Sequence, residues 1–342
     1  MGYAFVATRD SSDIAVVNLA AFALEKERIK PSGKPIQLLD VPKTDFLYTV
    51  GENGIVEEVS VSSSAIVRKL KQTVAPQEVW ISFDGKTIWA VSADRKKLLA
   101  VDRASLETRS EWSLPDKAGV LAVSPETEHV ALTFPDSRQI GILSSDSQKE
   151  FRIAKLDKNL DQIRFLKNGS MILVAQKTDR QLTLVDSALA RTVVQLPLPL
   201  QPENLCFSTD GGQLFITGEG LDAVVVVYPF QSQVAATLLS GKAPGPMAAS
   251  PQFLFVTSPS TDMVSVLDIR AQKLAALVAV GNDPRCVVLT PDNQMALVLN
   301  QRSGDIAIIR LANIVSKRQK TAPLFTMIPV GSAPVAAIVR SV

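Results

Sequence analysis

Short apolar runs separated by turn residues repeat along the chain, and residues 261–311 show this pattern most clearly. Apolar and polar positions alternate imperfectly, as at Val264, Val266 and Leu267, and each run closes on Asp, Asn, Gly or Pro. Half-buried antiparallel strands have this pattern, whereas apolar residues of an amphipathic helix recur about every 3.6 residues. Four strands and their turns therefore occupy about forty residues, the size of one repeat unit.

Prolines mark the starts of these units. Five precede a predicted first strand: Pro35, Pro76, Pro202, Pro284 and Pro334. The gaps between them are close to multiples of about 42 residues. Proline suits a strand's first residue because it has no N–H to lose there. The period and the four strands per unit predict an all-β fold, a single-domain β-propeller of four-stranded antiparallel blades.

The predicted first strands lie at 78–82, 119–124, 161–166, 204–208, 246–250, 286–290 and 335–339. The predicted second strands lie at 46–50, 87–92, 129–134, 171–176, 213–218, 253–258 and 295–300. Tight turns rich in Asp, Asn, Gly and Pro separate many of these pairs, as hairpins require.

The two chain ends each supply part of one blade. Residues 332–342 contain a first strand with nothing after it, while Tyr3–Thr8, Asp13–Asn18 and Leu24–Lys30 supply second, third and fourth strands. We expect the C-terminal strand to join the N-terminal blade, because a closed ring leaves no unpaired inner edge. Counting this shared blade gives eight blades, with seven as the alternative.

One domain is predicted over 1–342, with its closing blade built from 1–33 plus 332–342. The other repeats are expected near 34–74, 75–116, 117–157, 158–200, 201–242, 243–282 and 283–331.

The clearest copies resemble a known family. Residues 280–311, VGNDPRCVVLTPDNQMALVLNQRSGDIAIIRL, are similar to the YVTN-type β-propeller repeat of prokaryotic surface-layer and periplasmic proteins. Leu297–Asn300 stand where that family has Tyr-Val-Thr-Asn, and 214–218 and 254–258 are similar copies. The resemblance implies a fold related to the haem nitrite-reductase and lactonase-like propellers. Most such propellers resemble seven-bladed rings, so a count of eight departs from the commoner pattern.

Composition and charge limit the classes of binding partner that the sequence implies. The 342 residues include 36 Lys+Arg and 34 Asp+Glu, and this net charge of +2 implies neither nucleic acid nor an anionic membrane as a partner. No window approaches eighteen consecutive apolar residues, so no membrane span is predicted. We expect a monomer. The sequence begins MGYAFVAT within a strand-like run, and we expect an upstream targeting segment and a periplasmic, cell-surface or secreted protein.

Few residues suggest a catalytic, metal-binding or phosphate-binding site. Cys206 and Cys286 lie in first strands two repeats apart, so both are expected to be free and buried. The only histidine, His129, stands beside a turn, and no spacing suits zinc or calcium. Residues 218–220, Gly-Glu-Gly, lie between strands, so a hairpin loop is favoured over a phosphate loop. No cofactor, metal or catalytic residue is predicted.

Aspartates recur at the ends of third strands, and we expect them to cap turns. They are Asp94, Asp102, Asp179, Asp186, Asp262 and Asp268.

Two sets of residues are candidates for binding. The first set flanks the apolar pairs of the first strands and is expected to point toward the channel mouth: Glu78, Gln162, Arg164 and Asn204. The second set lies in charged loops between second and third strands, on the face that also bears the proline loops: Arg95, Lys96, Lys177 and Arg180. Loops on a rigid scaffold commonly carry binding, so a partner is expected on this face. The basic run 317–320 is interpreted as a solvated loop.

These observations favour a non-enzymatic β-propeller that acts as a binding or interaction scaffold for an unknown protein or polymer. The alternative is a lactonase-like hydrolase with a site at the central channel. A set of converging ionisable side chains at the channel mouth would favour that alternative.

Overall fold

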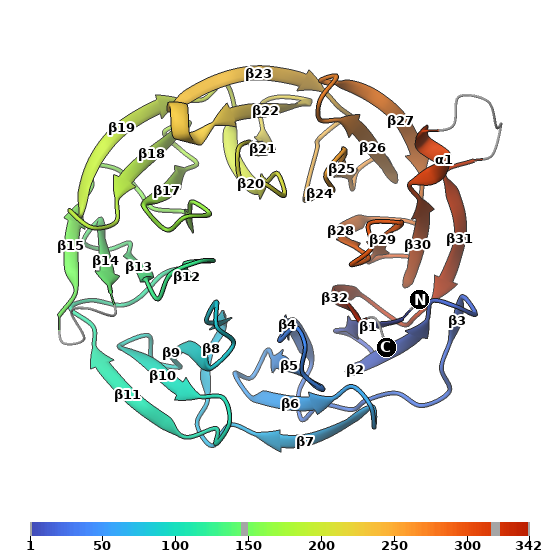
Figure 1. Ribbon diagram of the computed structural model, residues 1–342, viewed down its shortest axis with the longest axis horizontal. Coiled ribbons are helices and arrows are strands. Elements are labelled where there is room, and N and C mark those ends of the chain that lie inside the picture. The colour runs from blue at the N-terminus through green and yellow to red at the C-terminus, as the bar shows by residue number, and fades with distance from the viewer. Residues whose placement is uncertain (1, 145–149, 316–321, 341–342) are drawn as a thin grey trace.

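The computed structural model describes residues 2–144, 150–315 and 322–340, which are almost entirely antiparallel strands arranged in a ring (Figure 1). These residues form eight four-stranded sheets. The predicted eight-bladed β-propeller is therefore confirmed, and the alternative of seven blades is wrong.

Each blade runs from an inner strand beside the ring axis to an outer strand at the rim. Blade 1 comprises β4 (Pro35–Asp40), β5 (Phe46–Gly51), β6 (Val56–Ser60) and β7 (Ala65–Lys69). Blade 2 comprises β8 (Val74–Ile81), β9 (Thr87–Ser92), β10 (Lys97–Asp102) and β11 (Thr108–Ser113). Blade 3 comprises β12 (Leu121–Val123), β13 (Val130–Phe134), β14 (Gln139–Leu143) and β15 (Arg152–Lys155). Blade 4 comprises β16 (Gln162–Phe165), β17 (Met171–Gln176), β18 (Gln181–Asp186) and β19 (Arg191–Pro197).

The second half of the ring repeats this order. Blade 5 comprises β20 (Gln201–Phe207), β21 (Leu214–Glu219), β22 (Ala223–Tyr228) and β23 (Gln233–Leu239). Blade 6 comprises β24 (Met247–Ala249), β25 (Phe253–Ser258), β26 (Met263–Asp268) and β27 (Lys273–Ala279). Blade 7 comprises β28 (Pro284–Leu289), β29 (Met295–Asn300), β30 (Asp305–Arg310) and β31 (Leu324–Pro329). A short 3-10 turn, η2 (Pro229–Gln231), and a short helix, α1 (Ala312–Val315), lie between third and fourth strands.

The closing blade joins the two ends of the chain. Its order is β32 (Pro334–Arg340), β1 (Tyr3–Thr8), β2 (Asp13–Asn18) and β3 (Ala23–Leu24), all antiparallel. Ring closure by the C-terminal strand is thus confirmed.

The predicted fourth strand at Leu24–Lys30 is shorter than expected. Only Ala23–Leu24 pairs as β3, followed by an isolated bridge between Ile14 and Ile29. Between them, the side chain of Arg28 turns inward to donate to the Asp13 carboxylate at 3.0 Å. This ion pair and the charged run before it interrupt the outer strand.

The hydrophobic core lies between neighbouring blades. Along β29, Leu297 and Leu299 pack with the closing blade, whereas Ala296 and Val298 pack with blade 6. Side chains alternate between the two faces of a strand, so a strand sandwiched between two blades must be apolar on both faces. This explains why the second and third strands have nearly continuous apolar sequences.

The two cysteines differ in part from expectation. Cys206 and Cys286 are both free, as predicted, but each is only partly buried. Both lie on inner strands, which are less buried than the second and third strands because no further strand covers their axis side. Desolvation raises the pKa of each thiol to about 11.

Five of the six predicted turn aspartates accept backbone N–H bonds. The donors are Lys96 to Asp94 (3.1 Å), Ser105 to Asp102 (2.8 Å), Ala188 to Asp186 (2.9 Å), Asp283 to Asp262 (2.8 Å) and Ala271 to Asp268 (2.7 Å). Asp179 lies instead 3.8 Å from the Lys158 ammonium group.

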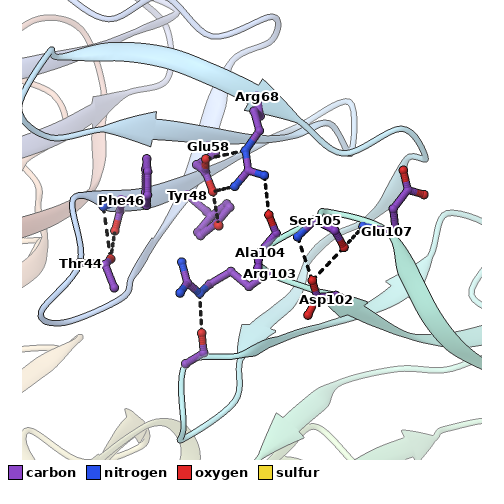
Figure 2. A network of polar contacts seen from close by, with 11 residues as sticks. Thr44, Phe46, Tyr48, Glu58, Arg68, Asp102, Arg103, Ala104, Ser105 and Glu107 are labelled. Atoms are coloured by element: carbon purple, nitrogen blue, oxygen red, sulfur yellow. Dashed lines mark hydrogen bonds and ion pairs between the residues drawn. The ribbon is translucent and has the colours of Figure 1, made fainter.

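A network of polar contacts connects blades 1 and 2 at Glu58 (Figure 2). The buried Glu58 carboxylate accepts two bonds from Arg68, at 2.8 and 2.7 Å, and another from the Tyr48 hydroxyl. Arg68 also donates to the carbonyl of Ala104 in blade 2 at 2.6 Å. Burial raises the pKa of Tyr48, and the bond to Glu58 adds to this shift. A buried carboxylate needs such partners, so this network is structural.

Candidate functional site

Two kinds of loop share one face of the ring. The loops that precede inner strands bond to the loops that join second and third strands: Glu52 N–H donates to Lys34 O at 2.9 Å, and Gln301 N–H to Asp283 O at 2.9 Å. We call this side the loop face, and the opposite side, which carries the other turns, the turn face. The predicted arrangement of these loops is therefore correct.

Glu78 is the most buried of the predicted site residues. It lies on β8 of blade 2, is 8% exposed, and accepts a bond from Leu121 N–H of blade 3 at 2.6 Å. Desolvation raises the pKa of Glu78, and the charges of Arg95 and Arg164 oppose that shift. Three predicted residues thus interact electrostatically near the inner strands.

The two arginines of this group are held in different ways. Arg95 donates to the carbonyls of Ala118 at 3.1 Å and Gly119 at 2.7 Å, which ties its loop to the start of blade 3. Arg164 donates to the carbonyl of Ile163 at 2.8 Å, and its guanidinium carbon lies 5.9 Å from the centroid of the Trp80 ring. Desolvation lowers the pKa of Arg164. We refer to Glu78, Trp80, Arg95 and Arg164 as the Glu78 cluster.

A second group of predicted residues meets at Glu203 of blade 5. The Lys177 ammonium lies 2.6 Å from the Glu203 carboxylate and 3.8 Å from that of Glu219. The Gln162 side chain donates to the Glu203 carbonyl. The hydrogen bond with Glu203 is the largest cause that raises the pKa of Lys177.

A cavity of about 650 Å³ opens on the loop face between blades 5, 6 and 7. Asn204, Glu219, Asp222, Arg285 and Arg302 are among the residues that line this loop-face pocket, together with Glu203. Its lining therefore combines both signs of charge with an amide.

Of the remaining predicted residues, Arg180 lies near the loop-face pocket and Lys96 lies away from it. Arg180 is exposed, and its guanidinium lies close to Gly220 of the pocket. Lys96 is exposed on a loop of blade 2, away from the pocket. The structure thus brings Gln162, Lys177, Arg180 and Asn204 to the pocket region, and Glu78, Arg95 and Arg164 to the Glu78 cluster. The basic run 317–320 lies outside the described residues.

Sequence reasoning missed Glu203 and Arg285 because each sits at a β-bulge. The strand register shifts between Pro202 and Asn204 and again between Pro284 and Cys286. A bulge redirects the side chain of its extra residue. The sequence did contain one indication of these two residues, because each is a charged residue that directly follows the proline of an inner strand.

Other chemistry is limited in the described part of the chain. No cluster of three or more His, Cys, Asp or Glu side chains there is arranged to hold a metal ion. His129 is partly buried, with its ring centroid 6.5 Å from that of Phe165. Among the described residues, no helix has the length and apolar character needed to span a membrane.

Comparison with known proteins identifies the fold. No family model matches the chain, and no curated protein matches it by sequence. The structure is similar to the dihydro-heme d1 dehydrogenase NirN in complex with DHE, with 11% identity, a TM-score of 0.82, and coverage of 98% of this chain and 75% of that one. This similarity shows the propeller fold alone.

Two further solved structures are similar. One is the hydrazine synthase of Kuenenia stuttgartiensis, with 14% identity, a TM-score of 0.58, and coverage of 76% of this chain and 88% of that one. The other is a functionally unknown protein from Desulfotomaculum acetoxidans, with 9% identity, a TM-score of 0.63 and 99% coverage of both chains. At these identities the likeness again concerns the fold.

Proposed function

We propose that this protein is a non-enzymatic β-propeller that serves as a binding scaffold and engages a protein or polymer partner through its loop face. The observation that carries this proposal is the loop-face pocket, about 650 Å³ in volume and lined by carboxylates, guanidinium groups and an amide. A concave surface on a rigid scaffold with convergent polar groups is the usual setting for binding.

The charged side chains around this pocket form ion pairs that a binding partner can replace. Glu219 is 66% exposed and lies 3.8 Å from Lys177, while Arg285 is 52% exposed beside Asp283. Exposed ion pairs contribute only about 0–1 kcal/mol. A partner with both signs of charge can therefore replace these pairs at little cost, and its binding is expected to weaken as salt is raised.

The test compares two triple variants with the same change in charge. The loop-face variant replaces the exposed side chains of Lys96, Arg180 and Arg302 with Gln, and the control variant replaces Lys43, Lys167 and Arg270 on the turn face with Gln. Both variants and the parent are immobilised, and proteins and polymers from the source organism are applied at low salt. The proposal expects a retained partner that the loop-face variant loses and the control keeps. Equal retention by all three proteins, or loss only with the control, contradicts it.

A second candidate function rests on the Glu78 cluster. A buried carboxylate with a raised pKa, facing two arginines, is a possible general acid in a lactonase-like hydrolase. We favour the scaffold because the Glu78 carboxylate already accepts the Leu121 N–H and is only 8% exposed. Assays of γ-butyrolactone and δ-valerolactone hydrolysis, in which the released acid is measured by base consumption, distinguish the two functions. Turnover that is abolished in Glu78→Gln supports the hydrolase.

The resemblance of 280–311 to the YVTN-type repeat is the basis for two further parts of the proposal. The protein is assigned to that type of propeller, and to the periplasm, the cell surface or the secreted fraction. Fractionation of source cells followed by immunodetection tests the location, and recovery only with the cytoplasmic fraction contradicts it.

A further inference from the structure

All three tryptophans of the chain lie on one side of blade 2. Trp80 on β8 and Trp89 on β9 are directly paired across the sheet, and Trp112 lies on the outer strand β11. All three pack in the apolar cluster that blade 2 forms with Leu121 and Leu132 of blade 3. The tryptophans of this protein are therefore concentrated at a single interface between blades.

The two outer tryptophans line a cavity of about 300 Å³ between blades 2 and 3. The ring centroids of Trp89 and Trp112 are 5.7 Å apart, and their planes are inclined by 35°. Both side chains are partly exposed. The cavity opens toward the turn face, since Asp84 and Glu128 from the hairpin turns of the two blades line it. We call it the Trp pocket. It lies on the face opposite the loop-face pocket.

The walls of the Trp pocket combine apolar and polar groups. The two indoles, with Val123 and Leu143, provide apolar surface, and hydroxyl and charged side chains provide the rest. A cavity of this volume is at the lower end of the range of small-molecule sites. Tryptophan surface left in contact with water is unfavourable, so a ligand that covers it gains free energy.

The charges of the pocket disfavour an anionic ligand. Among the described lining residues, Asp84 and Glu128 supply two carboxylates and Arg109 supplies one guanidinium, and the Lys86 ammonium lies 3.6 Å from the Asp84 carboxylate. That guanidinium is already paired with the Asp102 carboxylate. A phosphate or carboxylate ligand would therefore meet net repulsion, while hydroxyl donors would find acceptors.

The arrangement of the indoles differs from that of an aromatic cage for a cationic ligand. Aromatic cages that bind ammonium groups surround the cation with ring faces. Here the rings of Trp89 and Trp112 pack against each other, with no room for a cation between their faces. A ligand with one apolar face and a polar edge fits the surface of these two indoles.

We propose that the Trp pocket binds a pyranose ring of a neutral oligosaccharide. The C–H face of the sugar lies on the indoles, and its hydroxyls donate to Asp84 and Glu128 and accept from Arg109. This site is separate from the loop-face function, because it lies on the opposite face and recognises a sugar ring.

The location of the tryptophans provides a direct assay. Since all three lie at this interface, indole fluorescence reports on it without added labels. Cellotriose, maltotriose and triacetylchitotriose are titrated into the intact protein, with tetramethylammonium and adenosine monophosphate as comparison ligands. A saturable emission change with at least one trisaccharide, together with saturation transfer from the protein to the axial ring protons of that sugar, is expected. Binding of tetramethylammonium or the nucleotide without any trisaccharide overturns the proposal, as does no binding at all.

Matched variants locate the bound sugar. Glu128→Gln changes an exposed lining side chain and is expected to weaken binding about tenfold, because a hydrogen bond to a charged group is lost. Glu126→Gln, in the same turn but outside the pocket lining, is expected to leave binding unchanged. Trp112→Phe retains an aromatic ring and is expected to weaken binding less than Trp112→Ala, with folding checked by thermal melting. Equal affinity in all of these variants places the sugar elsewhere and overturns the proposal.

Discussion

Individual hydroxyl and carboxylate side chains determine the turns of the turn face. In blade 5, the Ser208 hydroxyl donates to the Asp210 carboxylate at 2.6 Å, and that carboxylate accepts Gly212 N–H at 2.9 Å. Gln213 N–H returns to the Ser208 oxygen at 2.9 Å. The same arrangement recurs at Ser82 with Asp84 and at Thr290 with Asp292. A serine or threonine two residues before an aspartate thus forms the same closed hydrogen-bonded turn in three blades.

The first prediction concerns the pH dependence of such a turn. The bond from the Ser208 hydroxyl, followed by the Gly212 N–H, lowers the pKa of Asp210. An aspartate with a lowered pKa stabilises the fold above its unfolded pKa of about 3.9, and this stabilisation is lost as pH falls through the folded pKa. Asp210→Asn is therefore expected to lower Tm at pH 7 and to differ less from the parent near pH 3. Asp136→Asn, in an exposed turn of blade 3, is the control. An equal Tm difference at both pH values would contradict this account.

The closing blade depends on one strand and on one arginine at its end. Arg340 of β32 is 11% exposed and donates to the carbonyls of Thr44 at 3.1 Å and Val41 at 2.9 Å. It also donates to Phe46 O at 2.7 Å and lies 2.6 Å from the Asp40 carboxylate. Desolvation raises the pKa of Asp40, with the charge of Arg340 opposing the shift. The C-terminal strand is thereby fixed to blade 1 as well as to β1.

The second prediction follows from these contacts. Arg340→Met keeps an unbranched side chain but removes the guanidinium from three carbonyls and the Asp40 carboxylate, while the Thr44 hydroxyl still donates to Val41 O and Phe46 O. The expected loss is about 2–3 kcal/mol of unfolding free energy. Arg152→Met is a suitable control, because Arg152 also donates to a carbonyl of the neighbouring blade, Ala188, but is exposed. Chemical denaturation of both variants measures the difference. Equal effects of the two substitutions would show that the position of Arg340 in the closure is unimportant.

The elements of this fold were largely predictable because each blade repeats a local pattern. Apolar runs such as 295–300 and turn signals such as Pro291-Asp292 are properties of neighbouring residues, and the β32 closure follows from counting strands at both ends. The shortened strand β3 was missed because it depends on Arg28, whose partners lie on other segments. Glu203 was missed because a bulge sets its direction, and Glu58 because its partners come from β5 and β7. Contacts between distant residues are not encoded in a local pattern.

At the scale of the whole molecule, one repeated scaffold presents two different faces. Every blade contributes similar apolar strands to the ring, whereas the loop-face pocket and the Trp pocket each arise where a few blades depart from the repeat. On the loop face, the departures are the charged residues Glu203 and Arg285, at bulges that carry Ile36 and Val335 in two other blades. Toward the turn face, they are the three tryptophans of blade 2. The common strands therefore account for the fold, and the irregular positions account for the proposed sites.

Closure of the ring by a shared blade can be tested by circular permutation. Neighbouring blades meet mainly through packed side chains, whereas β32 and β1 are joined by a ladder of backbone hydrogen bonds. Joining the end of β32 to the start of β1 by a short hairpin turn and cutting between Gly281 and Asn282 leaves every blade continuous, so no hydrogen-bonded strand holds the new ends together. Cutting instead between Asp292 and Asn293, in the turn between β28 and β29, recreates a shared blade. The second permutant should unfold more slowly and melt higher, even though its cut damages the Thr290–Asp292 turn. Each kcal/mol of difference corresponds to roughly 2–4 °C in Tm. If the permutant with continuous blades equals or exceeds the other in Tm and in unfolding time, strand sharing does not stabilise this ring.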